Sequence, residues 1–225
     1  MNDLADRVIA DTDGMIVIDK PAGISSVGMK LDDSNCVQFH VMEYAGGMVW
    51  AVHQLDKETS GVNLFVREKG LVERCRLRMT YPAGTKRYLA LCEGSPARDS
   101  FTVDAPIGPL DPEGRFLGVS RNGRSAISDV TVRARGRNAA LVEVRLHTGR
   151  THQIRIHLSH VGHALLGETW YRPEPCQRAP RQMLHANSLT LGPDGDEPAV
   201  TFTAPPPPEF LKVAVACRLG SAAAP

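Results

Sequence analysis

Short apolar runs predict most of the strands of this chain. Residues 15–19, which are apolar except for Asp19, read as a buried strand that stops at Lys20-Pro21-Ala22-Gly23, where proline and glycine favour a turn. Residues 141–147 alternate between apolar and polar side chains, which is typical of a strand with one buried face. The same signals predict strands at residues 62–66, 87–93, 128–133, 184–191 and 199–203, whereas residues 101–103 and 116–119 are short apolar pieces.

Three other segments have the spacing of helices. Between residues 69 and 79, apolar side chains recur on one side of a helix, and residues 81–84 end it. After Gly149, the stripe of Ile154, His157, Leu158 and Val161 predicts an amphipathic helix that ends near Gly162. A short helix is expected at residues 208–217, after four prolines. Residues 94–125 are expected to form loops and hairpins, and residues 24–47 have no clear period.

Strands and helices mix without a strict βαβ rhythm. We therefore expect an α+β fold with a largely antiparallel mixed sheet flanked by helices. No linker is long enough to divide the chain, so residues 1–225 are expected to form a single domain. Residues 220–225 are expected to be a disordered tail.

Composition is typical of a globular protein, with 42% hydrophobic and 23% charged residues among 225. No apolar run approaches the roughly 20 residues of a membrane span, and residues 1–18 lack a secretory signal. An intracellular, cytoplasmic protein without a membrane partner is expected, and a mitochondrial location stays open. The cysteines form no Cys-x-x-Cys pair and are expected to be reduced and mostly buried; they are Cys36, Cys75, Cys92, Cys176 and Cys217.

The net charge of +1 does not by itself indicate a nucleic-acid partner. Arginine nevertheless dominates the cations, and its side chain can stack on bases and bind phosphates through two hydrogen bonds. On composition alone, a surface with dispersed charge is the better interpretation. The arginines concentrate at positions 74, 76, 78 and 87 and at 121, 124, 133, 135, 137, 145, 150 and 155.

Three polar segments carry the candidate chemistry. The first, His53-Gln54-Leu55-Asp56-Lys57-Glu58-Thr59-Ser60-Gly61, places a carboxylate in a loop between two apolar runs. A lone Asp there is usually a turn residue, so its significance depends on the other segments. These are Lys86-Arg87-Tyr88 and Gly149-Arg150-Thr151-His152-Gln153-Ile154-Arg155-Ile156-His157.

Other kinds of site have weaker support. His152, His157, His160 and His163 crowd one helix, but no Cys or acidic residue stands at the usual spacing for zinc. Glycine-rich phosphate loops are absent, which argues against a nucleotide cofactor. Ser60 lacks the Gly-x-Ser-x-Gly context of a hydrolase, and a hydrolase using Asp56 would need a histidine within hydrogen-bond reach.

Taken in order and spacing, the three segments resemble the RluA-type family of RNA pseudouridine synthases. The resemblance covers about residues 12–210. Three further segments extend it: Val17-Ile18-Asp19-Lys20-Pro21-Ala22-Gly23-Ile24, Gly162-His163-Ala164-Leu165-Leu166-Gly167-Glu168 and Met183-Leu184-His185-Ala186. The resemblance implies an isomerase that converts uridine in structured RNA, either tRNA or rRNA, to pseudouridine without a cofactor or metal.

The same resemblance assigns three catalytic residues. Asp56 is implied as the catalytic aspartate, which attacks the ribose C1′ or the base, or takes the sugar C2′ proton; the sequence does not choose among these. Arg155 is expected to pair with this carboxylate and keep it ionised, because burial alone would raise its pKa. Tyr88 is expected to stack on the target base, which must leave the RNA helix to be reached.

The remaining residues of the three segments are expected to bind RNA or position the loops. These are His53, Gln54, Thr59, Ser60, Lys86, Arg150, Thr151, His152 and Gln153. Gln54 departs from the family, in which many members have an Arg that fills the gap left by the flipped base. Since the match starts near residue 12, no S4-like RNA-binding module is expected ahead of it.

A second interpretation is a protein that binds RNA or assists ribosome assembly with the same fold but without turnover. The presence of Asp56, Tyr88 and Arg155 argues against it, whereas Gln54 leaves room for it. Ribosome-assembly partners are conceivable under either interpretation, and the oligomeric state is not indicated.

Overall fold

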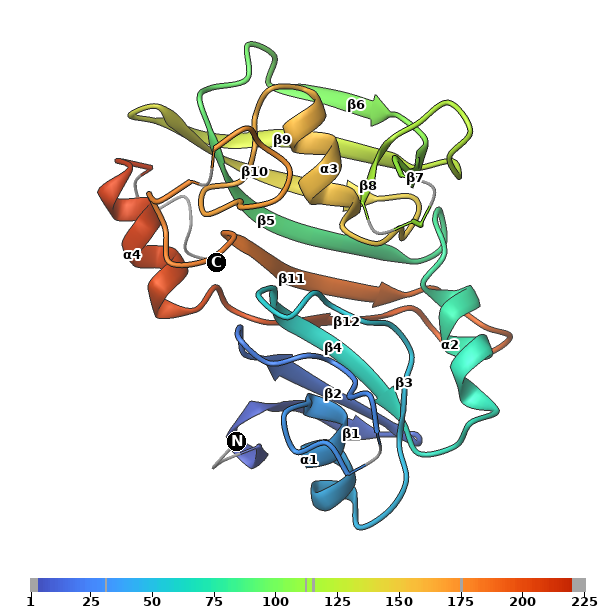
Figure 1. The fold of residues 1–225 in the computed structure, drawn as a ribbon. Coiled ribbons are helices and arrows are strands. Elements are labelled where there is room, and N and C mark those ends of the chain that lie inside the picture. The colour runs from blue at the N-terminus through green and yellow to red at the C-terminus, as the bar shows by residue number, and fades with distance from the viewer. Residues whose placement is uncertain (1–3, 31, 112, 115, 175, 220–225) are drawn as a thin grey trace. The chain divides into compact units, whose positions relative to one another are not determined.

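The computed structural model describes residues 4–30, 32–111, 113–114, 116–174 and 176–219 (Figure 1). The predicted tail at 220–225 lies outside these residues. The helices are η1 (Ala5–Arg7), α1 (Val37–Ala45), α2 (Leu71–Arg78), α3 (Gln153–His160) and α4 (Pro208–Ala216). The strands are β1 (Val8–Thr12), β2 (Met15–Lys20), β3 (Trp50–Ala51), β4 (Ser60–Val66), β5 (Thr85–Glu93), β6 (Ser100–Asp104), β7 (Ile107–Pro109), β8 (Leu117–Val119), β9 (Ile127–Gly136), β10 (Ala139–Leu146), β11 (Leu184–Leu191) and β12 (Val200–Thr203).

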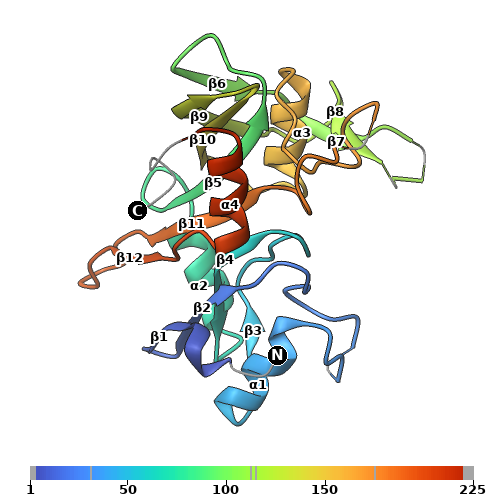
Figure 2. The same cartoon turned by 90° about the vertical axis from the view of Figure 1, so that its left-hand side faces the viewer.

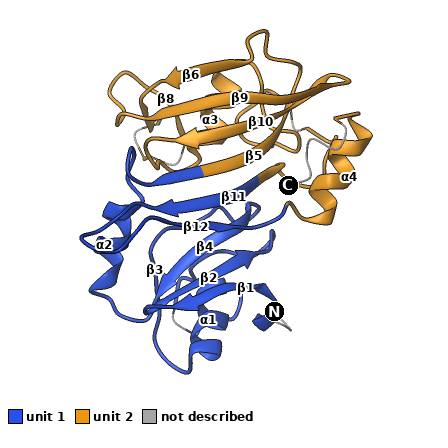
Figure 3. Ribbon diagram, turned by 180° about the vertical axis from the view of Figure 1, so that it is seen from behind, with its two compact units in different colours: residues 1–86, 185–205 blue, residues 87–184, 206–225 orange. Residues whose placement is uncertain are grey.

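The chain divides into two compact units (Figure 3). Unit 1 combines Met1–Lys86 with His185–Pro205, and unit 2 combines Arg87–Leu184 with Pro206–Pro225. The unit boundary therefore passes through β5 and β11. That all of residues 1–225 form one catalytic domain stays a prediction.

Unit 1 is built on the strand order β1-β2-β4-β11, with β3 paired to β4 and β12 to β11. Every residue of β4 is buried, because the sheet is covered on both faces. On one face Val62 and Leu64 join a core that includes Cys75 and Met79 from α2 and its C-terminus. On the other face Phe65 joins the core around α1. Burial on both faces explains why β2 and β4 read as continuous rather than alternating apolar runs.

Unit 2 is built on the strand order β5-β10-β9-β6. Phe210 and Ala214 of α4 pack with Leu91 and Leu141, whereas Ile156 of α3 packs near the β7–β8 hairpin. Figure 2 shows this hairpin beside α3. The pairs β9·β10, β6·β9 and β7·β8 are antiparallel, and the one parallel pair with a recorded register, β4·β11, lies in unit 1. The predicted α+β class with a largely antiparallel mixed sheet is confirmed.

Most predicted elements are present, and the structure adds features that the sequence pattern did not indicate. The segment 24–47, for which no element was predicted, contains α1; only Val37 and Val41 of its nine residues are buried, so the apolar stripe is too short to stand out. Arg78 at the end of α2 is buried and donates hydrogen bonds to the backbone of Gly192 and Pro198 and to Glu197. Strand β1 was not predicted, and β6, β7 and β8 lie in the segment for which loops and hairpins were expected.

The five cysteines are free thiols, and all are buried, as predicted. Among the described residues, no helix has both the length and the hydropathy to cross a membrane.

Candidate active site

Asp56 lies in the loop between β3 and β4, and its side chain is half-buried. The backbone N–H of Thr59 donates to the carbonyl of Asp56 at 3.0 Å, which closes a tight turn. Leu55 on one side is buried, whereas Gln54 is exposed. The loop therefore presents the Asp56 carboxylate at the surface of unit 1, while its neighbour Leu55 anchors the chain.

Two buried polar side chains hold the backbone on either side of Asp56. Before it, the Ser26 hydroxyl accepts from the backbone N–H of Leu55 at 2.9 Å and donates to its carbonyl at 3.3 Å. After it, the Lys20 ammonium donates to the carbonyl of Lys57 at 3.1 Å. Both contacts are to backbone atoms of the neighbouring residues, so they do not involve the Asp56 side chain.

Lys20 is 0% exposed, which is rare for a lysine. Its ammonium also donates to the carbonyls of Pro21 at 3.0 Å and Ile24 at 2.6 Å, so three acceptors replace the water that burial removes. The segment that follows β2 and the Asp56 loop are therefore joined by one charged group.

Lys20→Met should destabilise the protein by about 2–3 kcal/mol, because the carbonyls of Pro21, Ile24 and Lys57 each lose a hydrogen bond from a fully buried donor while the aliphatic volume is kept. Activity should fall as well, since the loop around Asp56 loses one of its side-chain supports. Urea denaturation and a pseudouridine assay measure the two effects. Lys57→Met is the matched control, because this exposed lysine contributes its carbonyl and not its side chain to the contact. Equal behaviour of the two variants would contradict the role of Lys20.

The end of the loop is fixed by β11. Ser60 and Gly61 pair in parallel with His185 and Ala186. Gly61 has φ 110°, and a Cβ there would lie 2.2 Å from the Ala186 carbonyl oxygen, so only glycine permits this approach. Two segments that define the resemblance are thus neighbours in space, although 125 residues separate Ser60 from His185.

Ser60 and Thr59 are each 2% exposed, which fits loop positioning rather than contact with RNA. The Ser60 hydroxyl lies 3.0 Å from His185 Nδ1, and His185 Nε2 lies 3.0 Å from the carbonyl of Ala204. Since the carbonyl only accepts, Nε2 carries the proton and Nδ1 accepts from Ser60. A serine buried in this way is not a nucleophile open to substrate, which weakens the hydrolase interpretation.

His53 also supports the loop. Its Nε2 accepts from the backbone N–H of Leu64 at 3.3 Å, and its carbonyl accepts from Asn63 Nδ2 at 3.1 Å. Burial, followed by the positive charges of Lys86 and Arg76, lowers the pKa of His53 to about 3. His53 is therefore neutral at physiological pH and acts as a hydrogen-bond acceptor.

In unit 2, Arg155 of α3 is 5% exposed and is not the solvated helix charge that its sequence context alone would suggest. Its Nε donates to Glu168 Oε2 at 2.9 Å and its Nη2 to Glu168 Oε1 at 2.8 Å. The guanidinium carbon lies 5.5 Å from the ring centre of Trp170 and 5.1 Å from that of Tyr171. A carboxylate and two aromatic rings therefore fix the orientation of this side chain.

Glu168 was not among the predicted site residues. Burial raises its pKa, but the hydrogen bonds from Arg155 and from the backbone N–H of Trp170 outweigh burial and place the pKa below its usual range. Glu168 is 0% exposed and also accepts from the backbone N–H of Thr169 at 3.0 Å. The sequence signal was present, because Glu168 ends one of the segments that extend the resemblance.

Tyr88 of β5 is buried, at 9% exposure. The neighbouring Arg87 donates to Glu143 at 2.7 Å. Consecutive strand residues project to opposite faces, so Tyr88 and Arg87 belong to different faces of the unit 2 sheet.

The turn that leads into α3 is organised by Gln153, which is 2% exposed. Its Oε1 accepts from the Thr148 hydroxyl at 2.8 Å and from the backbone N–H of Arg150 at 3.0 Å, and its Nε2 donates to Ser128 and Ile127, each at 3.0 Å. Of the two roles expected for Gln153, RNA binding and loop positioning, these contacts fit loop positioning.

The other polar residues of this turn differ in exposure. His152 has φ 55°, and its Nδ1 lies 2.6 Å from the Tyr171 hydroxyl, so it supports the aromatic rings around Arg155. Thr151 is exposed and Arg150 is half-buried, so both can meet a ligand.

His157 of α3 contacts the Ser128 hydroxyl and the carbonyl of Ala105, which makes it a core histidine rather than a metal ligand. Among the residues with described positions, no three His, Cys, Asp or Glu side chains gather as metal ligands do.

Asp56 and the half-buried Lys86 belong to unit 1, whereas Tyr88 and Arg155 belong to unit 2. The structure thus shows how each unit holds its own candidate residues. The predicted partnership of Asp56 with Arg155 and Tyr88 stays a prediction.

Residues 14–160 match the model of a family described as RNA pseudouridylate synthase. An uncharacterized RNA pseudouridine synthase of Bacillus subtilis, YlyB, is 33% identical over 162 residues, which are 72% of this chain and 54% of that protein. The chain thus spans about half the length of this relative. The ribosomal large subunit pseudouridine synthase D of Pseudomonas aeruginosa is 30% identical over 227 residues, covering 93% of this chain and 71% of that protein.

The solved structure of human RNA pseudouridylate synthase domain containing 1 is similar in fold, with a TM-score of 0.72 and 27% identity. The alignment covers 88% of this chain and 82% of the human chain. The resemblance seen in the sequence is thus matched by the family model, by curated relatives and by the fold.

Proposed function

Because this chain belongs to the RNA pseudouridylate synthase family, we propose that it is an isomerase that converts specific uridines in structured RNA to pseudouridine, with Asp56 as its catalytic carboxylate. The observation that carries the proposal is the loop of unit 1, in which buried Ser26 and Lys20 hold the backbone of the residues on either side of Asp56. A carboxylate held in this way is pre-positioned for chemistry.

The proposed reaction needs no cofactor, because uracil is both leaving group and incoming group. The bond between N1 and the ribose C1′ breaks, the uracil turns, and C5 bonds to C1′; the proton on C5 leaves and N1 gains one. Asp56 assists by attack on C1′ or on the base, or by removal of the C2′ proton. Tyr88 is proposed to stack on the turned base, and Arg155 to supply the cation that favours an ionised Asp56.

The RNA is proposed to be rRNA or tRNA. The printed name of the Pseudomonas aeruginosa relative, a ribosomal large subunit synthase, supports rRNA. RNA contacts are proposed for Gln54, Lys86, Arg150, Thr151 and His152, whereas His53, Thr59, Ser60 and Gln153 position the loops. The same proposal includes an intracellular location, a catalytic core formed by residues 12–210, and partners in ribosome assembly.

The proposal is tested by mapping pseudouridine in total RNA from cells with and without the active protein. Loss of at least one site in the deletion strain, and its return when the wild-type gene is restored, is the expected result. If every site is unchanged in the deletion strain, and purified protein also fails to modify that RNA, the proposal is wrong. Binding of RNA without any modification would favour the interpretation as a non-catalytic RNA-binding factor.

A further inference from the structure

Unit 2 contains a pocket of about 260 Å³ between the β7–β8 hairpin, the turn at residues 122–124 and the turn that leads into α3. Two of its lining residues are cations, Arg124 and Arg150, and none is acidic. The others are Ile107, Gly108, Pro109, Leu117, Asn122, Gly123, Gly149 and Thr151. The pocket is therefore positively charged.

Neither guanidinium group of this pocket has a carboxylate partner in the part of the chain that the structure describes. Arg150 donates through Nε to the carbonyl of Ser125 at 2.9 Å. Within the residues that the structure describes, neither Arg150 nor the exposed Arg124 forms an ion pair. The pKa of Arg150 is lowered mainly by burial. The second cause is repulsion by the positive charge of Arg124. An anion between them would remove this repulsion.

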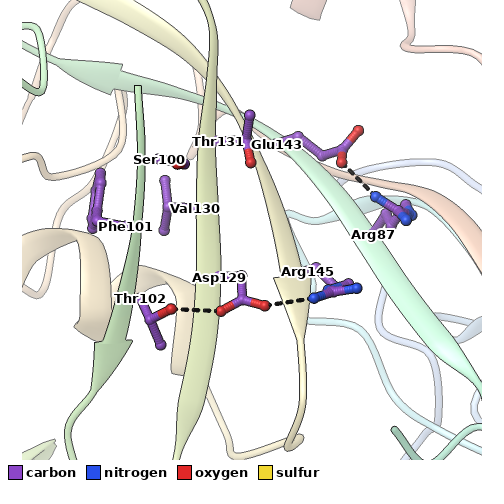
Figure 4. Close-up of a pocket in the computed structure, with 9 residues that line it drawn as sticks. All are labelled: Arg87, Ser100, Phe101, Thr102, Asp129, Val130, Thr131, Glu143 and Arg145. Carbon is purple, nitrogen blue, oxygen red and sulfur yellow. Dashed lines mark hydrogen bonds and ion pairs between the residues drawn. The ribbon is translucent and has the colours of Figure 1, made fainter. Parts of the chain in front are cut away.

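A second pocket of unit 2 shows the contrasting case (Figure 4). It has a volume of about 320 Å³ and also contains two arginines, but Arg87 is paired with Glu143 and Arg145 with Asp129. The charges there are satisfied within the protein. The arrangement in the first pocket is thus a property of that pocket and not a general feature of arginines in this unit.

Glycines keep the wall of the first pocket free of side chains. A Cβ on Gly108 would lie 2.9 Å from the Cα of Gly123, and a Cβ on Gly123 would lie 2.5 Å from the carbonyl carbon of Ile107. The two backbone segments are therefore in direct contact, and they leave room for a ligand that the arginines can reach. Thr151, Asn122 and Arg124 are exposed at this pocket, which makes it accessible to a large molecule.

We propose that this pocket binds a backbone phosphate of the RNA substrate through Arg124 and Arg150. The inference rests on the proposed function. It adds a phosphate site at the β7–β8 hairpin and a role for Arg124, which no segment of the resemblance includes. Arginine suits a phosphate because its planar group forms two parallel hydrogen bonds. Such a contact adds affinity without reading the sequence and fixes how the RNA lies on unit 2.

The test measures how the affinity for a fluorescent oligouridylate depends on salt between about 50 and 200 mM. Log affinity falls as log salt rises, and each lost phosphate contact should make this slope shallower by about 0.7 for a single strand. Arg124→Ala is expected to lose one contact. The double variant, which also carries Arg150→Ala, is expected to lose two. Arg150→Lys, which keeps the charge, should keep most of the slope. Arg133→Ala is the matched control, because this arginine is paired with Glu143 and its side chain is 48% exposed.

A second arm adds inorganic phosphate at constant ionic strength. Phosphate should compete with the oligouridylate on the wild-type protein and not on the double variant. If the double variant has the slope of Arg133→Ala while the wild type binds and modifies RNA, this inference is overturned and the proposed function stands. If phosphate binds at the pocket but the wild type and the double variant have equal salt slopes, the site takes free phosphate rather than RNA, and the inference is again overturned. If the wild type neither binds nor modifies RNA, the proposed function itself fails.

Discussion

Asp56→Asn is expected to reduce the rate of pseudouridine formation by at least about 10³-fold while RNA affinity stays close to that of the wild type. Asn has the size of Asp but carries no charge and cannot act as a nucleophile or base. The loop should keep its conformation, because Ser26 and Lys20 contact the backbone of Leu55 and Lys57 and not the Asp56 side chain. The variant therefore separates chemistry from binding.

Single-turnover kinetics with saturating enzyme measure the rate on an RNA that the mapping experiment identifies. Glu58→Gln serves as the control, since it removes a carboxylate two residues away in the same loop. It should retain activity within about tenfold of the wild type. If Asp56→Asn retained activity similar to that of Glu58→Gln, Asp56 could not be the catalytic carboxylate.

Arg155→Ala is expected to lower the free energy of unfolding by about 3–5 kcal/mol and to abolish activity. The reason is that Glu168, which is 0% exposed, would lose the cation that pairs with its buried carboxylate. The backbone N–H groups of Thr169 and Trp170 would remain as its donors, but neither carries a charge. The aromatic rings of Trp170 and Tyr171 would also lose the group between them.

Urea denaturation measures this change, and a second substitution identifies its cause. Replacing Glu168 by Gln in the Arg155→Ala background should restore part of the stability, because the unpaired buried charge is removed. Activity should not return. Arg133→Ala is the control on the surface of the same unit and should cost about 1 kcal/mol or less. An Arg155→Ala variant as stable as Arg133→Ala would show that the pair with Glu168 contributes little.

The sequence predicted the strands well where burial leaves a periodic or continuous apolar pattern, as in β2, β10 and β11. It failed for α1, since two buried residues in nine do not make a pattern. The resemblance pointed to Asp56, Tyr88 and Arg155 because it works on segments rather than on single residues. Glu168 ends one of these segments but was not assigned a role.

There is a physical reason why the residues that support the site could not be predicted from the sequence. A lysine before Pro21 is normally a solvated turn residue, and nothing local indicates that Lys20 meets the carbonyl of a residue 37 positions later. In the same way, the bond between Ser60 and His185 depends on which strands lie side by side. Local sequence determines periodicity, but partners distant in the chain are determined by topology.

The pairing of β4 with β11 bears on how the protein is made. During translation, Gly61 leaves the ribosome more than 100 residues before Ala186, its partner. At about 5–20 residues per second, the nascent chain carries an open edge of β4 for on the order of 10 s. The segment that holds Asp56 can therefore reach its final form only after β11 has been synthesised, so a translation product truncated before β11 would not be active.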